Sequence, residues 1–384
     1  MNNLPITTGR VIGKMMRKAL ILLLLIGITF LTGCWDVQEI SKRGIANAVF
    51  FDTENGGQLK MGVVLSVPGT EMPPIVGTTQ QFDKRHYVIT GEGDSFVEAW
   101  TETKATTVRN IFFGQNRAVI LSEKLARENI NDILDFVGRI PLIPPNTRVL
   151  ITRDDLVELM EMQNRDNLTP GNYIDFYFQT PDIRSLAIPV DLWRVNSIID
   201  QKTADPFIPM LEASQNNYRI TGTALFSQNR MVGDLSKDET QTLSLIRGTD
   251  VGYLTVPLNH NQHVAFANVR SKTKITPNMS PGDSLNFNVN VDIQGALVES
   301  FPHREIGRQE KQEIERKGES LMKQEMESLI AKLQSLNTDP VGFAGKFRIA
   351  YPRDWEDIDW NEVYPTAEIT VNANFTVKET GLFR

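Results

Sequence analysis

Short apolar runs bounded by turn residues predict most of the strands in this chain. The run 117–121 is apolar almost throughout, which is typical of a strand buried in a sheet. The segments 285–298 and 367–377 alternate apolar and polar residues, which indicates strands with one buried and one solvated face. The other strands predicted in this way are 45–51, 59–67, 86–91, 148–152, 207–213, 218–226, 230–235, 251–256 and 264–269.

Capping signals and apolar residues at helical spacing predict the helices between these strands. Ser95, with Glu98 three residues later, has the pattern of a capping box at a helix start. Asp154 is the expected cap of another helix, and within 168–206 only a short helix near 189–199 is predicted. Further helices are expected over 122–138, 238–246 and 303–336.

The helix over 303–336 is the longest one predicted, and its apolar residues form one stripe. These residues, spaced alternately by four and three, are Met322, Met326, Leu329, Leu333 and Leu336. The spacing resembles a coiled-coil seam, although it lasts only about two heptads. Packing of the stripe on the protein's own sheet explains the pattern better, because most amphipathic helices pack in this way.

The first 33 residues have the pattern of an export signal. Basic residues without an acidic neighbour precede an apolar run over 19–31, which is shorter than the roughly 20 residues of a transmembrane helix. The run ends in Leu31-Thr32-Gly33-Cys34, the aliphatic, small, small, cysteine order of a lipobox. Cys34 is also the single cysteine of the chain, so no disulfide can form within it. We therefore expect cleavage before Cys34 and a diacylglycerol anchor on its sulfur, with the body outside the membrane.

Two points around this anchor stay open. One alternative is an uncleaved signal anchor that holds a cysteine by chance. Trp35 directly follows the expected lipid site. Its indole fits the membrane interface and, equally well, the interior of the first domain.

Length and strand–helix order predict an α+β (mixed α/β), multidomain fold, with mixed sheets, flanking helices and one long helix at 304–336. The expected parts are a lipoprotein signal peptide (1–33) and an N-terminal α/β domain (34–200). A strand-rich middle domain (201–270) and a C-terminal α+β domain (271–384) follow.

The charge balance limits the choice of partners. Of 384 residues, 41% are hydrophobic and 23% charged, which is ordinary for a globular protein. Loss of the four positive charges of the signal region takes the net charge from −7 to −11. This argues against binding nucleic acid or anionic lipid through bulk electrostatics.

No group of residues forms a convincing catalytic, cofactor or metal site. His260 and His263 make an H-x-x-H pattern, but they lie in a predicted hairpin loop without further ligands nearby. The acidic residues around Trp355 and Trp360 are Asp354, Glu356, Asp357 and Asp359. Packed tryptophans with solvated acids are favoured there over calcium binding or acid–base chemistry. With no nucleophile motif either, we expect a protein that is not an enzyme.

Four segments, in this order, resemble the C-subunit lipoproteins of bacterial spore germinant receptors, the Ger(x)C family. They are LTGCWDVQEI around Cys34, FGQNRAVILSEKLARENINDILDFVGR over 113–139, GTALFSQNRMVGDLSKDETQTLSLIRG over 222–248, and a region that begins with DPVGF at Asp339 and ends at Tyr364-Pro365. The resemblance covers essentially the whole chain after the anchor.

The resemblance implies a lipid-anchored subunit on the outer face of the inner membrane of the dormant spore. Proteins of this family act beside two integral membrane subunits, A and B, in an assembly that senses nutrients and triggers ion and dipicolinate release. The implied role is a non-enzymatic interaction subunit required for the germination response. The implied fold is mixed α/β with several domains.

Two other classes of lipoprotein compete with this interpretation. A solute-binding lipoprotein of a nutrient transporter shares the lipobox and an α/β body, but it normally has two similar lobes, and no repeated βαβ halves are visible here. A cell-envelope enzyme needs a catalytic group, and the sequence offers scattered histidines and no nucleophile.

Overall fold

The computed structural model describes residues 16–21, 42–54, 57–67, 85–180, 187–259, 261–279, 285–301 and 306–380. The chain divides into two compact units, Met1–Arg43 and Gly44–Arg384, and each is described by itself. In the first unit, residues 16–21 are helical. Among the described helices, none combines the length and the apolar character needed to cross a membrane.

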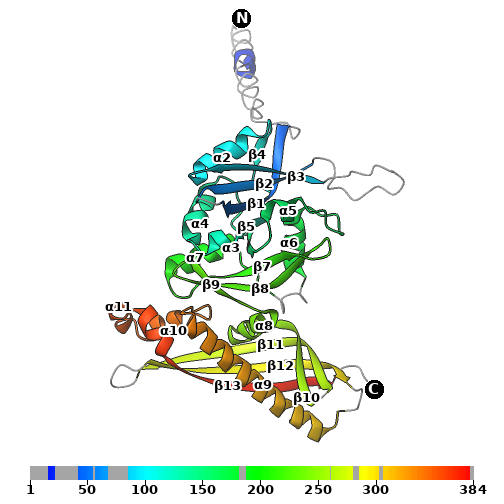
Figure 1. Cartoon of the computed structure of the whole chain (residues 1–384), viewed down its shortest axis with the longest axis vertical. Coiled ribbons are helices and arrows are strands. Elements are labelled where there is room, and N and C mark those ends of the chain that lie inside the picture. The colour runs from blue at the N-terminus through cyan, green and yellow to red at the C-terminus, as the bar shows by residue number, and fades with distance from the viewer. Residues whose placement is uncertain are drawn as a thin grey trace, which may run out of the picture. The chain divides into compact units, whose positions relative to one another are not determined.

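Nine strands form one mixed sheet in the order β3-β2-β1-β5-β6-β7-β8-β9, with β4 paired to β1 (Figure 1). The strands are β1 (Arg43–Thr53), β2 (Leu59–Ser66), β3 (His86–Gly93), β4 (Asn110–Phe112), β5 (Ala118–Ser122), β6 (Arg148–Thr152), β7 (Phe207–Ala213), β8 (Tyr218–Ser227) and β9 (Arg230–Leu235). The central strands β1, β5, β6 and β7 are parallel, and antiparallel strands flank them on both sides.

Helices cover both faces of this first sheet. The apolar core on one face includes residues of α2 (Phe96–Ala105), α3 (Glu123–Ala126), α4 (Ile130–Arg139) and α7 (Leu192–Gln201). A separate core on the other face includes residues of α5 (Leu156–Glu161) and α6 (Pro170–Gln179). Consequently every residue of β5 is buried, as its apolar sequence predicts.

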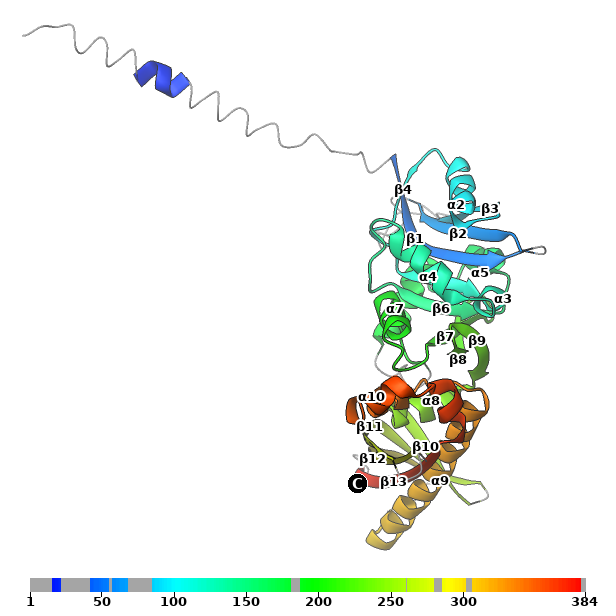
Figure 2. The ribbon, with the colours of Figure 1, turned by 90° about the vertical axis from the view of Figure 1, so that its left-hand side faces the viewer.

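Four long strands form the second sheet in the order β10-β11-β12-β13 (Figures 1 and 2). They are β10 (Val251–Asn259), β11 (Gln262–Met279), β12 (Leu285–Phe301) and β13 (Glu368–Thr380). The first three pair antiparallel, and β13 returns parallel to β12. The remaining helices are α8 (Lys237–Ile246), α9 (Arg308–Ser335), α10 (Phe343–Ala350), α11 (Asp354–Asp357), α12 (Trp360–Val363) and the 3₁₀ helix η3 (Tyr364–Thr366).

The long helix α9 packs on the second sheet, as favoured from the sequence. Met322, Met326, Leu329 and Leu333 are buried and belong to the same apolar core as the inner residues of β12 and β13. At Gly318 the helix approaches β13 so closely that an added Cβ would lie 2.8 Å from the ring of Phe375. The apolar stripe is therefore used within the chain.

Two helix predictions differ from the structure in where a helix begins. The helix expected over 122–138 is broken into α3 and α4, because the side chain of Asn129 accepts a hydrogen bond from the Asn131 amide and starts a new helix. The cap of α5 is Asp155, since the carboxylate of Asp154 accepts the amide hydrogen of Ala213 in β7 instead.

The segment with weak signals holds more structure than the sequence indicates. It contains α6, which starts at Pro170, and α7, which begins at Leu192 after Asp191 and not near 189. The buried apolar residues of α6 pack on one face of the first sheet. Their helical pattern extends over only ten residues, which is too short to predict the helix from the sequence.

The two sheets, the helices that flank them and the long α9 confirm the α+β fold class. The strands of the expected middle domain are distributed over the sheets, with β7 to β9 in the first and β10 in the second. Domain boundaries at 34, 201 and 271 stay a prediction, which limited proteolysis of the folded chain would test.

Candidate functional site

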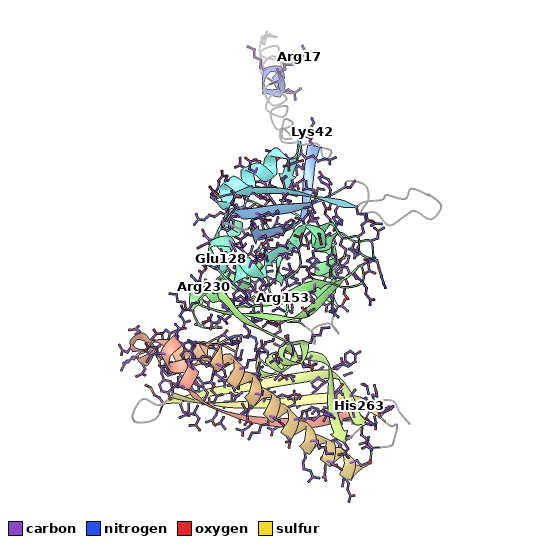
Figure 3. All side chains as sticks on the ribbon, in the orientation of Figure 1. Arg17, Lys42, Glu128, Arg153, Arg230 and His263 are labelled. Carbon is purple, nitrogen blue, oxygen red and sulfur yellow. The ribbon has the colours of Figure 1, made fainter. Side chains whose placement is uncertain are left out.

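Several residues singled out from the sequence lie outside the described residues, namely Cys34, Trp35 and His260. Lipid attachment at Cys34 therefore stays a prediction. His263 lies in β11, near the end of the β10–β11 hairpin (Figure 3). Its Nε2 is 3.1 Å from a carboxylate oxygen of Glu299, and its ring stacks on Phe301. In the part of the chain that the structure describes, no three histidine, cysteine or acidic side chains are grouped to hold a metal ion.

The two tryptophans of the acidic segment pack, and most of its acids are solvated. The rings of Trp355 and Trp360 are 5.9 Å apart between centroids, and Trp360 stacks on Tyr364 at 5.5 Å. The acids at 356, 357 and 359 are exposed, while Asp354 is half-buried. This arrangement agrees with the interpretation favoured from the sequence.

These tryptophans form one wall of a cavity of about 670 Å³. The opposite wall comes from the end of α7, the start of β7 and the turn between β8 and β9. The lining residues are Ile198, Ile199, Lys202, Ala204, Asp205, Pro206, Gln228, Asn229, Asp339, Ala344, Trp355, Glu356, Asp357, Ile358, Asp359, Trp360 and Asn361. Five of the side chains are acidic and one is basic, so the cavity favours a cation or an amine over an anion.

Two buried aspartates lie at the base of this cavity. The carboxylate of Asp339 accepts the amide hydrogens of Gly342, Phe343 and Ala344 at 2.8, 3.0 and 2.8 Å, which caps α10. Asp205 accepts the Asp339 amide at 2.7 Å and donates its own amide to the Asp339 carbonyl. The pair thus joins the chain before β7 to the chain after α9.

Burial disfavours the charged form of both acids. It raises the pKa of Asp205 to about 6 and that of Asp339 to about 7, although the hydrogen bonds from backbone amides act in the opposite direction. Burial also raises the pKa of the Tyr364 hydroxyl, and the negative charges of this pair act in the same direction. Because both oxygens of Asp339 are committed to the α10 backbone, this carboxylate is a structural cap and is poorly suited to acid–base catalysis.

Further contacts connect the same parts of the chain. The hydroxyl of Thr338 donates to the carbonyl of Phe226 in β8. The guanidinium of Arg247 donates to the carbonyl of Pro340 and lies over the ring of Phe207, 4.5 Å from its centroid. Lys332 of α9 forms an ion pair of 2.8 Å with a capping residue of α8, Glu239. These contacts connect strands β7 and β8 with α8, α9 and the chain that follows α9.

A second, smaller cavity of about 390 Å³ lies at the carboxyl ends of the parallel strands β1, β5 and β6. Open α/β sheets commonly bind ligands at this edge. Here Arg153, which Figure 3 labels, bridges Glu123 and Asp234. Arg127 also pairs with Glu123. Although partial burial opposes it, the hydrogen bonds from these two arginines lower the pKa of Glu123. The charged groups of this edge are thus largely neutralised by one another.

Sequence reasoning missed the aspartate pair, since its members are separated by more than a hundred residues. One local signal was available, because Asp339-Pro340-Val341-Gly342 places an acidic residue three positions before a glycine. Gly342 adopts φ +89°, a conformation that favours glycine, and it starts α10. The partner, Asp205, has no comparable signal.

Comparison with known proteins assigns the chain to a family. The model described as "Spore germination protein N-terminal domain" matches residues 36–213, and the one described as "Spore germination B3/GerAC like, C-terminal" matches residues 221–381. Together these matches span most of the chain. The chain therefore belongs to this family of spore germination proteins.

Individual relatives agree with the assignment. Spore germination protein B3 of Bacillus subtilis (strain 168) is 24% identical over 363 residues, which cover 91% of this chain and 95% of the relative. Spore germination protein GerQC of Bacillus cereus is 23% identical over 381 residues, covering 95% and 99%. The crystal structure of the GerBC protein shares the fold, with a TM-score of 0.57 at 22% identity, over 89% of this chain and 99% of that one.

Proposed function

We propose that this chain is a subunit of a nutrient germinant receptor, required for the germination response of the spore. The observation that carries the proposal is the match of both family models, end to end, over 36–213 and 221–381. It is supported by curated relatives that carry spore germination names and align over nearly their whole lengths.

The subunit is lipid-anchored through Cys34 and faces outward from the inner membrane of the spore. The lipobox supports this part of the proposal, since it ends two residues before the N-terminal family match begins. Two acyl chains hold a protein stably on a bilayer, whereas one chain alone binds only marginally.

The subunit acts through contacts with integral membrane A and B subunits and not as an enzyme. The commitment of the most deeply buried carboxylate, that of Asp339, to capping a helix supports a structural use of this group. A receptor complex of this kind predicts that the chain co-purifies with its membrane subunits from detergent-solubilised spore membranes.

The proposal is tested by deleting the gene in a spore-former whose other germinant receptors have been removed. Spores are exposed to a panel of amino acids and sugars, and dipicolinate release is followed, with a non-nutrient trigger as control. We expect loss of the response to one nutrient class and a normal response to the control trigger. Unchanged germination with every nutrient would contradict the proposal.

The anchor is tested with Cys34→Ala expressed from the native locus, with Asn288→Ala as a matched control on an exposed strand position. We expect Cys34→Ala to reduce membrane-bound protein and nutrient response, and the mass of the wild-type N-terminus to carry the lipid. An unmodified wild-type N-terminus would remove the anchor from the proposal. Saturable nutrient binding by the isolated chain together with an uptake defect would favour the solute-binding alternative.

A further inference from the structure

The cavity beside the two tryptophans has a buried base and an open rim. At its base Asp339 and Ala344 are buried. At its rim Glu356 and Asp357 are exposed. Its volume of about 670 Å³ lies within the range of roughly 300–1,000 Å³ that small-molecule pockets have. The cavity is therefore large enough for a small organic molecule, and its rim is open to solvent.

The walls between base and rim are largely apolar. The apolar lining side chains, all half-buried, are Ile198 and Ile199 of α7 on one side and Trp355, Ile358 and Trp360 on the other. The ring of Trp360 is already stacked on Tyr364. Trp355 meets Phe347 and Trp360 at interplanar angles of 57° and 46°, so neither ring is stacked on its face. The indole of Trp355 is thus the ring that suits a cation, while the isoleucines suit the apolar part of a ligand.

The exposed lining residues carry an excess of negative charge. In the part of the chain that the structure describes, the side chains of Glu356 and Asp357 form no ion pair and accept no hydrogen bond. A third exposed acid, Asp359, accepts the Asn361 amide at 3.0 Å and caps α12. Among the described residues, Lys202 at the end of α7 is the one basic residue that lines the cavity. Three exposed acids against one lysine leave two negative charges in excess.

Other basic side chains of the surrounding elements do not reduce this excess from within the cavity. None of them is among its described lining residues, namely Arg194, Arg230, Arg247, Lys346, Arg348 and Arg353. The guanidinium of Arg348 donates to the carbonyl of Gln201 at 3.3 Å, and that of Arg247 donates to the carbonyl of Pro340. The carboxylates of the rim therefore keep their capacity to bind a cation.

A buried hydroxyl without a partner faces the base of the cavity. Tyr364 is only 1% exposed, and its ring lies against that of Trp360. The charges of Asp205 and Asp339 act on its hydroxyl, which directs this group towards the two carboxylates. In the described part of the chain the hydroxyl has no hydrogen-bond partner. Because an unpaired buried hydroxyl is unfavourable, a ligand that carries an oxygen would be stabilised at the base.

The same features argue against other classes of ligand. A metal ion needs several oxygen ligands in fixed geometry, but the carboxylates of Asp205, Asp339 and Asp359 hold backbone amides. An anion is repelled by the rim, and so is the carboxylate of a free amino acid. The ligand that fits is a small organic ammonium ion without a carboxylate.

We propose that this cavity is a binding site for a small alkylated ammonium ion. The cationic group lies beside the indole of Trp355 and the carboxylates of Glu356 and Asp357, and the apolar part contacts Ile198 and Ile199. Aromatic faces attract alkylated ammonium ions because the ring carries negative charge on its faces and the ion is weakly hydrated. This inference goes beyond the proposed receptor role and does not depend on it.

The test uses the full-length chain in an uncharged detergent and isothermal titration calorimetry. The probe is choline, which combines an alkylated ammonium with a hydroxyl. Dimethylbutanol, the neutral analogue in which carbon replaces the nitrogen, is the control for shape. Glycine betaine, which adds a carboxylate to the same ammonium group, is the control for charge. We expect saturable binding of choline and at least about tenfold weaker binding of both controls.

Two variants place the site in the cavity. Trp355→Leu keeps an apolar side chain but removes the ring, and should weaken choline binding by about tenfold. Glu356→Gln/Asp357→Asn should weaken it by a similar factor, and it changes only exposed side chains, so it tests the site even if Trp355→Leu does not fold. The matched control is Glu158→Gln/Glu161→Gln, an equal change of charge on exposed positions of α5, which should leave choline binding unchanged.

Four results would overturn the inference. The first is the absence of saturable choline binding up to about 10 mM. The second is equal affinity for choline and dimethylbutanol, which would remove the role of the charge. The third is choline binding that neither cavity variant weakens, which would place the site elsewhere. The fourth is displacement of choline by an equal concentration of calcium, which would assign the cavity to a metal ion.

Discussion

In β1 the successive residues Phe50 and Phe51 are both inaccessible to solvent, whereas in β12 Phe287 is buried and the next residue, Asn288, is exposed. Successive side chains of a strand point to opposite faces of a sheet. Phe50 and Phe51 accordingly belong to two different apolar cores, one on each face of the first sheet. The second sheet has one apolar core, which it shares with α9.

The comparison shows how helix coverage of a sheet decides which residues its strands can carry. A sheet packed on both faces has no solvated positions in its central strands, so β5 is buried throughout. A sheet packed on one face presents polar side chains to water, and these can pair across strands. The amide of Asn372 donates to Asn290 at 3.1 Å, and the amide of Asn374 donates to Asp292 at 2.8 Å.

The largest effect is expected from truncation of the buried aromatics. Phe50→Ala and Phe51→Ala should each lower the free energy of unfolding by about 4 kcal/mol, because each leaves a cavity in a separate core. In the second sheet, Phe287→Ala should cost a similar amount and Asn288→Ala less than about 0.5 kcal/mol. Urea unfolding followed by circular dichroism measures these differences. A large cost for Asn288→Ala would mean that the outer face of the second sheet is covered.

A somewhat smaller effect is expected where the two sheets are joined. Asp339→Ala leaves three amide hydrogens at the start of α10 without their acceptor, and should cost about 3 kcal/mol. The exposed Asp357, on the same cavity, provides the control, and Asp357→Ala should change the unfolding free energy by less than about 0.5 kcal/mol. Equal effects of the two variants would show that the hydrogen bonds to Asp339 do not stabilise the connection between the two sheets.

The same joint predicts a dependence of stability on pH. In the unfolded chain an aspartate has a pKa of about 3.9, and in the folded chain the values for Asp205 and Asp339 are raised to about 6 and about 7. The folded state therefore binds protons more tightly, and this stabilisation is complete below pH 4 and lost as pH rises through 6 and 7. We expect the contribution of the joint to fall by a few kcal/mol over this range.

Urea titrations between pH 4 and 8 measure this dependence. Asp205→Asn should make the profile shallower, because the amide keeps a hydrogen-bond acceptor but does not titrate. Asp339 still titrates in this variant, so part of the dependence should remain. The profile of Asp357→Asn should follow that of the wild type. A wild-type profile that rises over this range, with no difference in Asp205→Asn, would contradict the raised pKa values.

The smallest effect is expected on the open face of the second sheet. Asn290→Ala removes an exposed hydrogen bond with Asn372, and should change the unfolding free energy by about 0.5 kcal/mol or less. A cost near that of Asp339→Ala would show that this face depends on its polar ladder for stability. The open face of the second sheet would then contribute to stability as much as a buried contact does.

Patterns within one segment predicted the fold well. The alternation in 285–298 gave a strand with one open face, and the capping pattern of Ser95 marked the start of α2, where its hydroxyl accepts the Glu98 amide. The predictions that failed depended on contacts between residues that are distant in sequence. Asp154 has the signature of a cap, but its carboxylate is used by Ala213 of another strand.

The same limit applies to the candidate site. The packing of Trp355 on Trp360 followed from their neighbourhood in sequence, whereas the cavity beside them also needs residues near Asp205 that no local pattern marks.

The position of β13 constrains the order in which this chain can fold. Strands β10, β11 and β12 pair with neighbours in sequence, so they can associate first. Helix α9 follows them in sequence, yet it packs on β13, whose Phe375 meets Gly318. Until β13 has joined the sheet, this surface of α9 and the edge of β12 stay uncovered. Premature termination before residue 368 should therefore produce an aggregation-prone product.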